Sequence, residues 1–196
     1  MLELILVRHG ETNSNKKGTY LGWTDIDLNA EGIRQAYLTK EKLKGIKVNK
    51  IFSSPLKRAK KTAQIVNENY NLEIIYSDCL KERNFGIWDD LTHEDIVSRY
   101  HEEYDKWIGD WVNYRIRDGE SALESYLRVV EYTRDFIVSR DTGTYVVVAH
   151  MGTIRFMLTY LLGMNIEDSW RFRLNNCSIS KVEISDGYAV LTLFNG

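Results

Sequence analysis

The sequence contains few of the residues that mark disulfide-rich or membrane-spanning proteins. Only 2 cysteines and 1 proline occur among 196 residues, and Cys79 and Cys177 lie far apart without a partner motif. We therefore expect reduced thiols in a cytoplasmic protein, without a disulfide or a metal site. The N-terminus lacks a cationic region followed by a long apolar core, so we expect no signal peptide. Since no apolar stretch approaches the length of a membrane span, we expect no membrane partner.

Charge of either sign is also not in excess. The net charge is -2 at pH 7, and no run of like charge stands out. A basic face for nucleic acid is therefore not expected. The length suits one well-buried domain, so we expect a single domain over residues 1–196. A homodimer is compatible with the sequence, but nothing in it requires one.

What the chain does contain is a regular alternation of strand and helix patterns. The runs that predict strands are Leu2–Val7, Val48–Ser53, Leu72–Tyr76, Thr144–Ala149, Ile179–Ile184 and Tyr188–Phe194. Helices are expected after caps at Asn29, Ser54, Thr92 and Ser121, and after His150. A loop is expected between the first strand and Trp23. This alternation predicts an α/β fold, a three-layer α/β/α arrangement with a mainly parallel central sheet.

Residues with useful chemistry gather at three strand-to-helix junctions. Arg8 and His9 follow the first strand, Arg58 lies in the first turn of the helix after the second, and His150 ends the valine-rich strand. Parallel strands present their carboxyl ends at one edge of the sheet, where such folds bind ligands. Helix N-termini there add free N–H groups, and arginine offers forked donors that match phosphate. The pattern indicates a pocket for a dianion.

Each of these residues alone also has a simpler interpretation. His9 or His150 could be a structural histidine, and Arg58 could be a solvated helix residue. Their expected convergence at one sheet edge favours the functional interpretation.

Several blocks of the sequence resemble one known family. The run Leu-Val-Arg-His-Gly-Glu-Thr at 6–12 resembles the signature of the histidine phosphatase superfamily, the phosphoglycerate-mutase-like fold. Further blocks are similar, in order, along nearly the whole chain: Gly22-Trp23, Ser53–Ala59, Leu80–Trp88 and Val147–Gly152.

The resemblance implies a covalent mechanism. His9 would attack phosphorus in line and form a phosphohistidine. Its other ring nitrogen would need an acceptor, such as the carbonyl of Gly10, to fix the tautomer. Arg8, Arg58 and His150 would hold the phosphoryl oxygens and stabilise the charge of the transition state.

The resemblance also implies an acid and further contacts. Glu82 would give a proton to the leaving alkoxide and then take one from the attacking water. Glu11 is a weaker candidate for this acid, and we expect it to have a structural role in its own loop. No metal or other cofactor is required. The implied contacts to substrate come from Asn15, Gly10, Gly22, Met151 and Gly152.

Two features favour a phosphatase over a mutase. Leu21 stands where the cofactor-dependent mutases resembled here have a small hydroxyl residue. A mutase must bind a second anionic group on its substrate, which requires further cations. The segment after Glu82 has one nearby cation, Arg83, before the acidic pair Asp89-Asp90. We therefore expect a phosphomonoesterase, and phosphoglycerate mutase is the alternative.

The segment at about 90–120 is expected to form a small helical cap over the C-terminal sheet edge. Its aromatic residues recur at steps of three and four and would form one stripe on a continuous helix: Tyr100, Tyr104, Trp107, Trp111 and Tyr114. Most of the stripe is expected to pack the cap onto the body. Trp107 and Trp111 are the candidates to line an apolar substrate pocket.

The cap also bears on the substrate. The aromatic segment and Arg115–Ser121 resemble the α-ribazole phosphatases of cobalamin nucleotide-loop assembly, whose substrate carries a flat dimethylbenzimidazole ring. The expected partner is thus a small-molecule phosphate ester, with α-ribazole 5′-phosphate first. Phosphoserine, a sugar phosphate and phosphoglycerate are alternatives. A phospho-ligand-binding regulator is the non-enzyme alternative, and the presence of both His9 and Glu82 counts against it.

Overall fold

The chain folds around one mixed sheet of six strands. The computed structural model describes residues 1–139 and 142–196. The strands lie in the order β3-β2-β4-β1-β5-β6. The pairs among β1 to β4 are parallel, and β5 and β6 add an antiparallel edge. The strands are β1 (Leu2–Arg8), β2 (Lys50–Ser53), β3 (Ile74–Tyr76), β4 (Gly143–Ala149), β5 (Ile179–Ser185) and β6 (Tyr188–Leu193).

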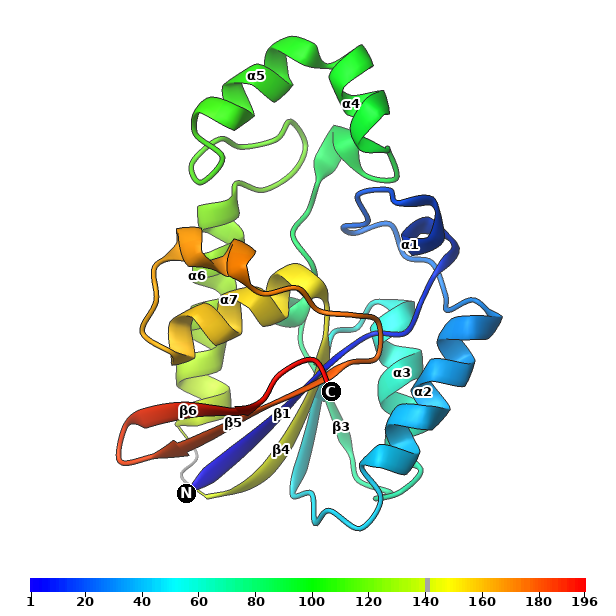
Figure 1. Cartoon of the computed structure of the whole chain (residues 1–196), viewed down its shortest axis with the longest axis vertical. Helices are drawn as coiled ribbons and strands as arrows, with labels where there is room; N and C mark the ends of the chain where they lie inside the picture. The colour runs from blue at the N-terminus through cyan, green and yellow to red at the C-terminus, as the bar shows by residue number, and fades with distance from the viewer. Residues whose placement is uncertain (140–141) are drawn as a thin grey trace.

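Helices cover both faces of the sheet (Figure 1). The α-helices are α1 (Asn13–Lys17), α2 (Ala30–Lys42), α3 (Lys57–Asn67), α4 (His93–Arg99), α5 (His101–Gly109), α6 (Ala122–Tyr132) and α7 (Met151–Leu161). Short 3-10 turns are Asp78–Leu80, Gly86–Trp88 and Ile166–Arg171, and a π-helical turn, Thr133–Val138, follows α6. The predicted three-layer α/β/α fold is confirmed.

The strand sequence explains the two layers. Side chains alternate across a strand, so Leu4 and Leu6 of β1 enter one core while Ile5 and Val7 enter the other. The first core contains residues of α6 and α7, and the second contains residues of α3 together with Leu43, which directly follows α2. Because both faces of β1 are covered, its sequence is a continuous apolar run.

Two local predictions were wrong. The expected loop before Trp23 contains the short helix α1, because Thr12 and Asn15 form a reciprocal capping box. The helix expected to be capped by Ser54 instead begins at Lys57, whose N–H donates to Asp25 Oδ1 over 2.6 Å. Ser54 precedes a proline and is therefore biased towards an extended conformation. The caps predicted at Asn29, Thr92 and Ser121 are confirmed.

Helices α4 and α5, with the chain that leads from them to α6, stand beyond the carboxyl ends of the parallel strands (Figure 1). This part of the chain has a small core of its own around the buried side chains of Trp88, Ile96 and Ile116. The chain turns at Tyr100, where φ is -135° and ψ is 38°, so α4 and α5 are separate helices. The aromatic stripe expected on one continuous helix is therefore not formed: Tyr104 and Trp107 lie on α5, whereas Trp111 and Tyr114 follow its end at Gly109.

Candidate active site

The three predicted junctions meet at one edge of the sheet. Arg8 is paired in register with Ala149, the residue before His150, and Ser53 at the end of β2 is paired with Val148. The ring centroids of His9 and His150 are 5.1 Å apart. The convergence predicted from strand order is confirmed.

His9 is held in one tautomer. Its Nδ1 lies 2.7 Å from the carbonyl oxygen of Gly10, and because a carbonyl only accepts, Nδ1 carries the hydrogen. The lone pair of a neutral ring is then on Nε2. The N–H of Gly10 donates to Thr62 Oγ1 over 3.1 Å. A Cβ on Gly10 would meet the carbonyl oxygen of Gly32 at 2.5 Å, so only glycine fits here. The predicted bond from His9 to Gly10 is confirmed.

Burial and nearby charge keep His9 neutral. Desolvation lowers the pKa of His9 well below its usual value, and the positive charges of Arg58 and Arg8 lower it further. The hydrogen bond to Gly10 acts in the opposite direction but is the smaller effect. A neutral imidazole with a free Nε2 is the form of histidine that can act as a nucleophile.

Of the two arginines beside His9, Arg58 is buried and Arg8 is half-buried, and both are only partly paired. Arg8 Nη1 donates to the carbonyl of Leu174 over 2.6 Å, and Arg58 Nη2 donates to that of Gly22 over 2.6 Å. The Nε atoms of Arg8 and Arg58 are buried and have no partner among the described residues. Burial lowers the pKa of each guanidinium to about 10, so both remain charged at neutral pH.

His150 presents a third unpaired donor. Its Nε2 lies 2.8 Å from Ser54 Oγ, which itself accepts the N–H of Leu56 over 3.3 Å. In the tautomer in which the serine hydroxyl donates to Nε2, the hydrogen of the neutral His150 ring lies on Nδ1. Nδ1 is buried and has no partner among the described residues. Burial, with the charge of Arg58, lowers the pKa of His150 well below its usual value.

Glu82 lines the same cavity as His9. Its Oε1 accepts the N–H of Arg83 over 2.9 Å and its Oε2 accepts that of Gly152 over 3.0 Å. A Cβ on Gly152 would collide with Glu82 Oε1, so glycine is required for this close approach. The carboxyl is thus placed beside the nucleophile by two backbone donors.

The cavity has a volume of about 320 Å³. Its polar end is lined by Arg8, His9, Asn15, Glu82 and Gly152, with Met151 beside them. The carbonyl oxygen of the Asn15 side chain accepts N–H groups of Thr12 and Asn176, which leaves its Nδ2 as a donor. Arg58 and His150 are fully buried and are not among the residues that line the cavity.

Two glycines expected to contact substrate lie elsewhere. Gly10 and Gly22 do not line the cavity. The N–H of Gly22 donates to Asp89 Oδ1 over 2.5 Å while its carbonyl accepts from Arg58, so this residue holds an arginine in place. Glu11 Oε1 accepts from Asn29 Nδ2 over 2.8 Å and also lies outside the cavity. The structural role expected for Glu11 is confirmed.

The other end of the cavity is aromatic. Trp107 of α5 and Trp111, which follows α5, both line it. Trp111 packs against Trp170 with ring centroids 5.6 Å apart. Other members of the stripe, Tyr100, Tyr104 and Tyr114, pack on the small core around Trp88, Ile96 and Ile116, and not on the two large cores of the body, as had been expected.

Sequence reasoning missed several residues on or near the cavity, and two of them make polar contacts at the site. Arg155 of α7 lines it, donates from Nε to the carbonyl of Phe172 over 2.6 Å, and lies 5.2 Å from the ring centroid of Trp170. Arg155 is four residues after Met151, so the two share one face of the predicted helix, and this spacing could have identified Arg155. Asn176 Nδ2 donates to the carbonyl of His9 over 3.1 Å. It belongs to no motif, so nothing in the sequence identified it.

Two further observations concern metal binding and membrane-spanning helices. In residues 1–139 and 142–196, no group of three or more histidine, cysteine, aspartate or glutamate side chains could hold a metal ion. None of the helices in these ranges is long and apolar enough to cross a membrane.

Comparison with known proteins agrees with this geometry. Over its whole length the chain is 33% identical to phosphoserine phosphatase 1 of Hydrogenobacter thermophilus, covering 92% of that protein. Over 99% of its length it is 30% identical to the adenosylcobalamin/alpha-ribazole phosphatase of Escherichia coli, covering 96%. The crystal structure of the alpha-ribazole phosphatase from Shigella flexneri matches with a TM-score of 0.92 at 29% identity, over 99% of this chain and 96% of that one.

The family comparison covers the same span. The model of the histidine phosphatase superfamily (branch 1) matches residues 4–196, which include every junction described above. The relatives named as phosphatases match over nearly the full chain. The chain therefore belongs to the histidine phosphatase superfamily and is a phosphatase.

Proposed function

We propose that the chain hydrolyses a small-metabolite phosphate ester in two steps through a phosphohistidine at His9. One observation carries this proposal: the free Nε2 of a neutral His9 lies beside three unpaired buried donors. These donors are Arg8 Nε, Arg58 Nε and His150 Nδ1. Unpaired buried donors are costly, and a phosphoryl group between them would accept all three bonds.

The first step transfers the phosphoryl group to the enzyme. The Nε2 lone pair of His9 attacks phosphorus, an N–P bond forms, and the bond to the ester oxygen breaks. Protonated Glu82 gives its proton to the departing oxygen, which leaves as an alcohol. Arg8, Arg58 and His150 stabilise the charge on the phosphoryl oxygens, and Asn15 adds a neutral donor.

The second step returns the enzyme to its starting state. Glu82, now a carboxylate, takes a proton from a water molecule as the water oxygen attacks phosphorus. The N–P bond breaks, inorganic phosphate leaves, and the electron pair returns to Nε2 of His9. The acid of the first step is thus the base of the second, so one carboxyl suffices.

For the substrate, we propose α-ribazole 5′-phosphate in cobalamin biosynthesis. Trp107 and Trp111 line the aromatic end of the cavity, where a flat ring would bury apolar area. The relatives from Escherichia coli and Shigella flexneri carry the same activity in their names. In this proposal, the segment at about 90–120 is a cap on a single domain. The two free cysteines support a cytoplasmic location.

Phosphoserine is the second candidate, on one observation. Arg155 lines the cavity close to its aromatic end, where a guanidinium would attract a carboxylate. The relative from Hydrogenobacter thermophilus is named for phosphoserine.

A kinetic comparison of the two esters tests the assignment. We expect kcat/KM for α-ribazole 5′-phosphate to exceed that for phosphoserine by about tenfold or more, because the ring adds one buried aromatic contact. The converse order, abolished by Arg155→Gln, would assign the enzyme to phosphoserine. Hydrolysis of neither ester would overturn both substrate assignments but leave the phosphatase chemistry in place.

A further inference from the structure

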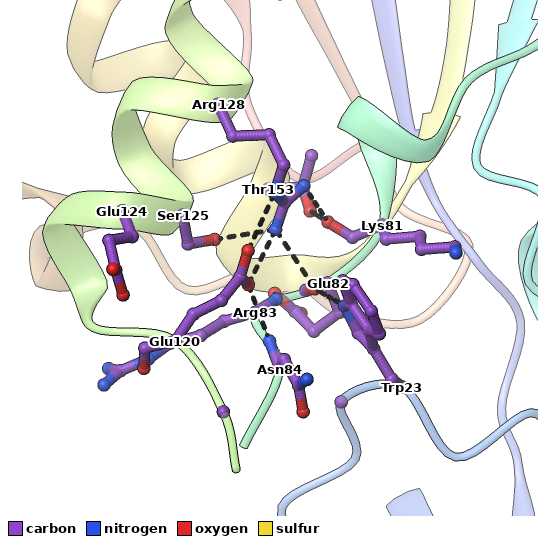
Figure 2. A network of polar contacts seen from close by, with 12 residues as sticks. Trp23, Lys81, Glu82, Arg83, Asn84, Glu120, Glu124, Ser125, Arg128 and Thr153 are labelled. Atoms are coloured by element: carbon purple, nitrogen blue, oxygen red, sulfur yellow. Dashed lines mark hydrogen bonds and ion pairs between the residues drawn. The ribbon is translucent and has the colours of Figure 1, made fainter. Parts of the chain in front are cut away.

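The side chain of Arg128 extends from α6 towards the segment that carries Glu82 (Figure 2). Its Nε and Nη2 donate to the two carboxylate oxygens of Glu120 over 3.0 and 2.9 Å, a forked ion pair. Its Nη1 donates to the carbonyls of Cys79 and Lys81 over 2.9 and 3.1 Å. Arg128 is not part of the cavity wall. It therefore acts on the acid-bearing segment from outside.

The carbonyls that Arg128 binds belong to a segment with little regular structure. Residues 81–85, between the 3-10 turn Asp78–Leu80 and Gly86, belong to no strand or helix. Their backbone groups are therefore not paired by regular secondary structure. Arg128 Nη2 also approaches the carbonyl of Glu82 itself, at 3.4 Å. Other donors reach the same stretch from two more sides: Thr153 Oγ1 to Lys81 over 3.0 Å, and Trp23 Nε1 to Glu82 over 2.8 Å. The direction of the backbone at Glu82 is fixed by these donors.

Glu120 holds the residues on the other side of Glu82. Its Oε2 accepts the N–H of Asn84 over 2.9 Å, and its own N–H donates to the carbonyl of Asn84 over 2.9 Å. Its carbonyl accepts from Arg83 Nε over 3.1 Å. Arg128 thus binds residues before the acid, Glu120 binds residues after it, and the ion pair joins the two.

The pair is partly shielded from water. The side chains of Arg128 and Glu120 are 19% and 16% exposed, whereas that of Arg134, which pairs with Asp135 just beyond α6, is 56% exposed. Surface ion pairs contribute little, but a forked and half-buried pair imposes a defined geometry. The location and geometry of this pair suit it to orient a neighbouring segment.

We propose that Arg128 and Glu120 are positioning residues that hold the Glu82 carboxyl within reach of the departing oxygen. This inference rests on the proposed function, in which Glu82 donates the proton as the P–O bond breaks. The two backbone donors to Glu82, Arg83 and Gly152, fix the carboxyl only while the segment keeps its path. Since proton transfer requires hydrogen-bond distance, a displacement of about 1 Å is enough to impair it.

The test compares esters whose leaving groups need the acid to different degrees. An alkyl phosphate leaves as a strongly basic alkoxide, whereas 4-nitrophenyl phosphate leaves as a stable phenolate. Arg128→Gln is expected to lower kcat/KM for the alkyl ester by about 10²-fold and that for 4-nitrophenyl phosphate by less than about threefold. Rates are normalised to the burst of 4-nitrophenolate, so that only folded active sites are counted.

The double variant separates positioning from general damage. In a Glu82→Gln background the acid is already absent, so adding Arg128→Gln is expected to cause no further loss on the alkyl ester. Glu120→Gln is a milder change. It is also expected to lower kcat/KM more for the alkyl ester than for 4-nitrophenyl phosphate, but by a smaller factor than Arg128→Gln. Arg134→Gln is the matched control, because it removes an exposed arginine of the neighbouring turn and is expected to change neither rate.

The outcomes distinguish the positioning role of Arg128 and Glu120 from the acid role of Glu82. Equal slowing of both esters by Arg128→Gln, or a further loss in the Glu82→Gln background, overturns the positioning role. If Glu82→Gln itself slows both esters equally, the acid role in the proposed function is wrong. Leaving-group selectivity in Glu82→Gln without any in Arg128→Gln overturns the positioning role alone.

Discussion

The two ends of the cavity are built from different kinds of structure. At the phosphate end, Arg8, His9 and His150 stand at the ends of central strands and Arg58 stands in the first turn of α3. His9, Arg58 and His150 are buried, and each has a hydrogen bond to a fixed group. At the aromatic end, Trp107 belongs to α5, a helix without any fully buried residue.

The two ends of the cavity also pack on hydrophobic cores of different size. The phosphate end rests on the two large cores on either side of the sheet, whereas α4 and α5 pack mainly on the small core around Trp88, Ile96 and Ile116. The proposed nucleophile and the proposed phosphate ligands are thus held by the sheet and α3. Trp107 and Trp111, proposed to select the substrate, lie on a separate segment.

The largest expected effect comes from His9. His9→Ala removes the nucleophile, so kcat for every phosphate ester is expected to fall by about 10⁴-fold or more. The measurement is steady-state hydrolysis of 4-nitrophenyl phosphate. His93→Ala, which changes an exposed histidine of α4, is the control and is expected to retain full activity. Activity of His9→Ala within tenfold of the parent would mean that the phosphate end is wrongly assigned.

Arg58 is expected to affect both the rate and its pH dependence. Because the pKa of His9 lies well below its usual value, the nucleophile stays neutral and the parent stays active below pH 6.5. Arg58→Gln removes a positive charge that lowers this pKa, so the pKa rises and the acid limb of kcat/KM moves to higher pH. The loss of one donor is expected to lower kcat/KM by about 10²- to 10³-fold.

The pH profile decides whether Arg58 acts through charge. Lys57→Gln removes the neighbouring exposed cation of α3 and is expected to leave both the limb and the rate unchanged. If the acid limb of kcat/KM stays at the same pH in Arg58→Gln, the charge of Arg58 does not affect the pKa of His9.

The aromatic end is expected to give the smallest effect, confined to one substrate. Trp111→Ala removes a ring that lines the cavity, so KM for α-ribazole 5′-phosphate is expected to rise about tenfold. KM for phosphoserine is expected to change by less than about twofold. Tyr188→Ala, on the far edge strand β6 and 74% exposed, is the control. Equal changes for both esters would mean that the two ends are not independent.

The phosphate end could be predicted from sequence because strand order decides it. Parallel strands bring the residues that follow them to one edge, so Arg8, His9 and His150 converge whatever the details of the loops. The predicted acceptor for His9, the carbonyl of Gly10, needed only the tautomer argument.

The remaining site could not be predicted, because it depends on tertiary contacts. The aromatic stripe is divided where α5 ends at Gly109, because Trp111 and Tyr114 lie beyond the helix. Gly22 was expected at the substrate but holds Arg58, a role visible only once the loop is folded. Arg155 reaches the cavity from the second turn of α7, and Arg128 reaches the acid segment from behind. Spacing in the sequence does not give these distances.

The central claim is that phosphate passes through Nε2 of His9, and trapping that intermediate tests it most directly. The enzyme is mixed with a ³²P-labelled phosphate ester, quenched within milliseconds in alkaline denaturant, and digested for peptide mapping. The account predicts a base-stable, acid-labile label on the peptide that contains His9, approaching one phosphate per chain, and none in His9→Ala. A label on another residue, or one that persists in His9→Ala, would contradict the account.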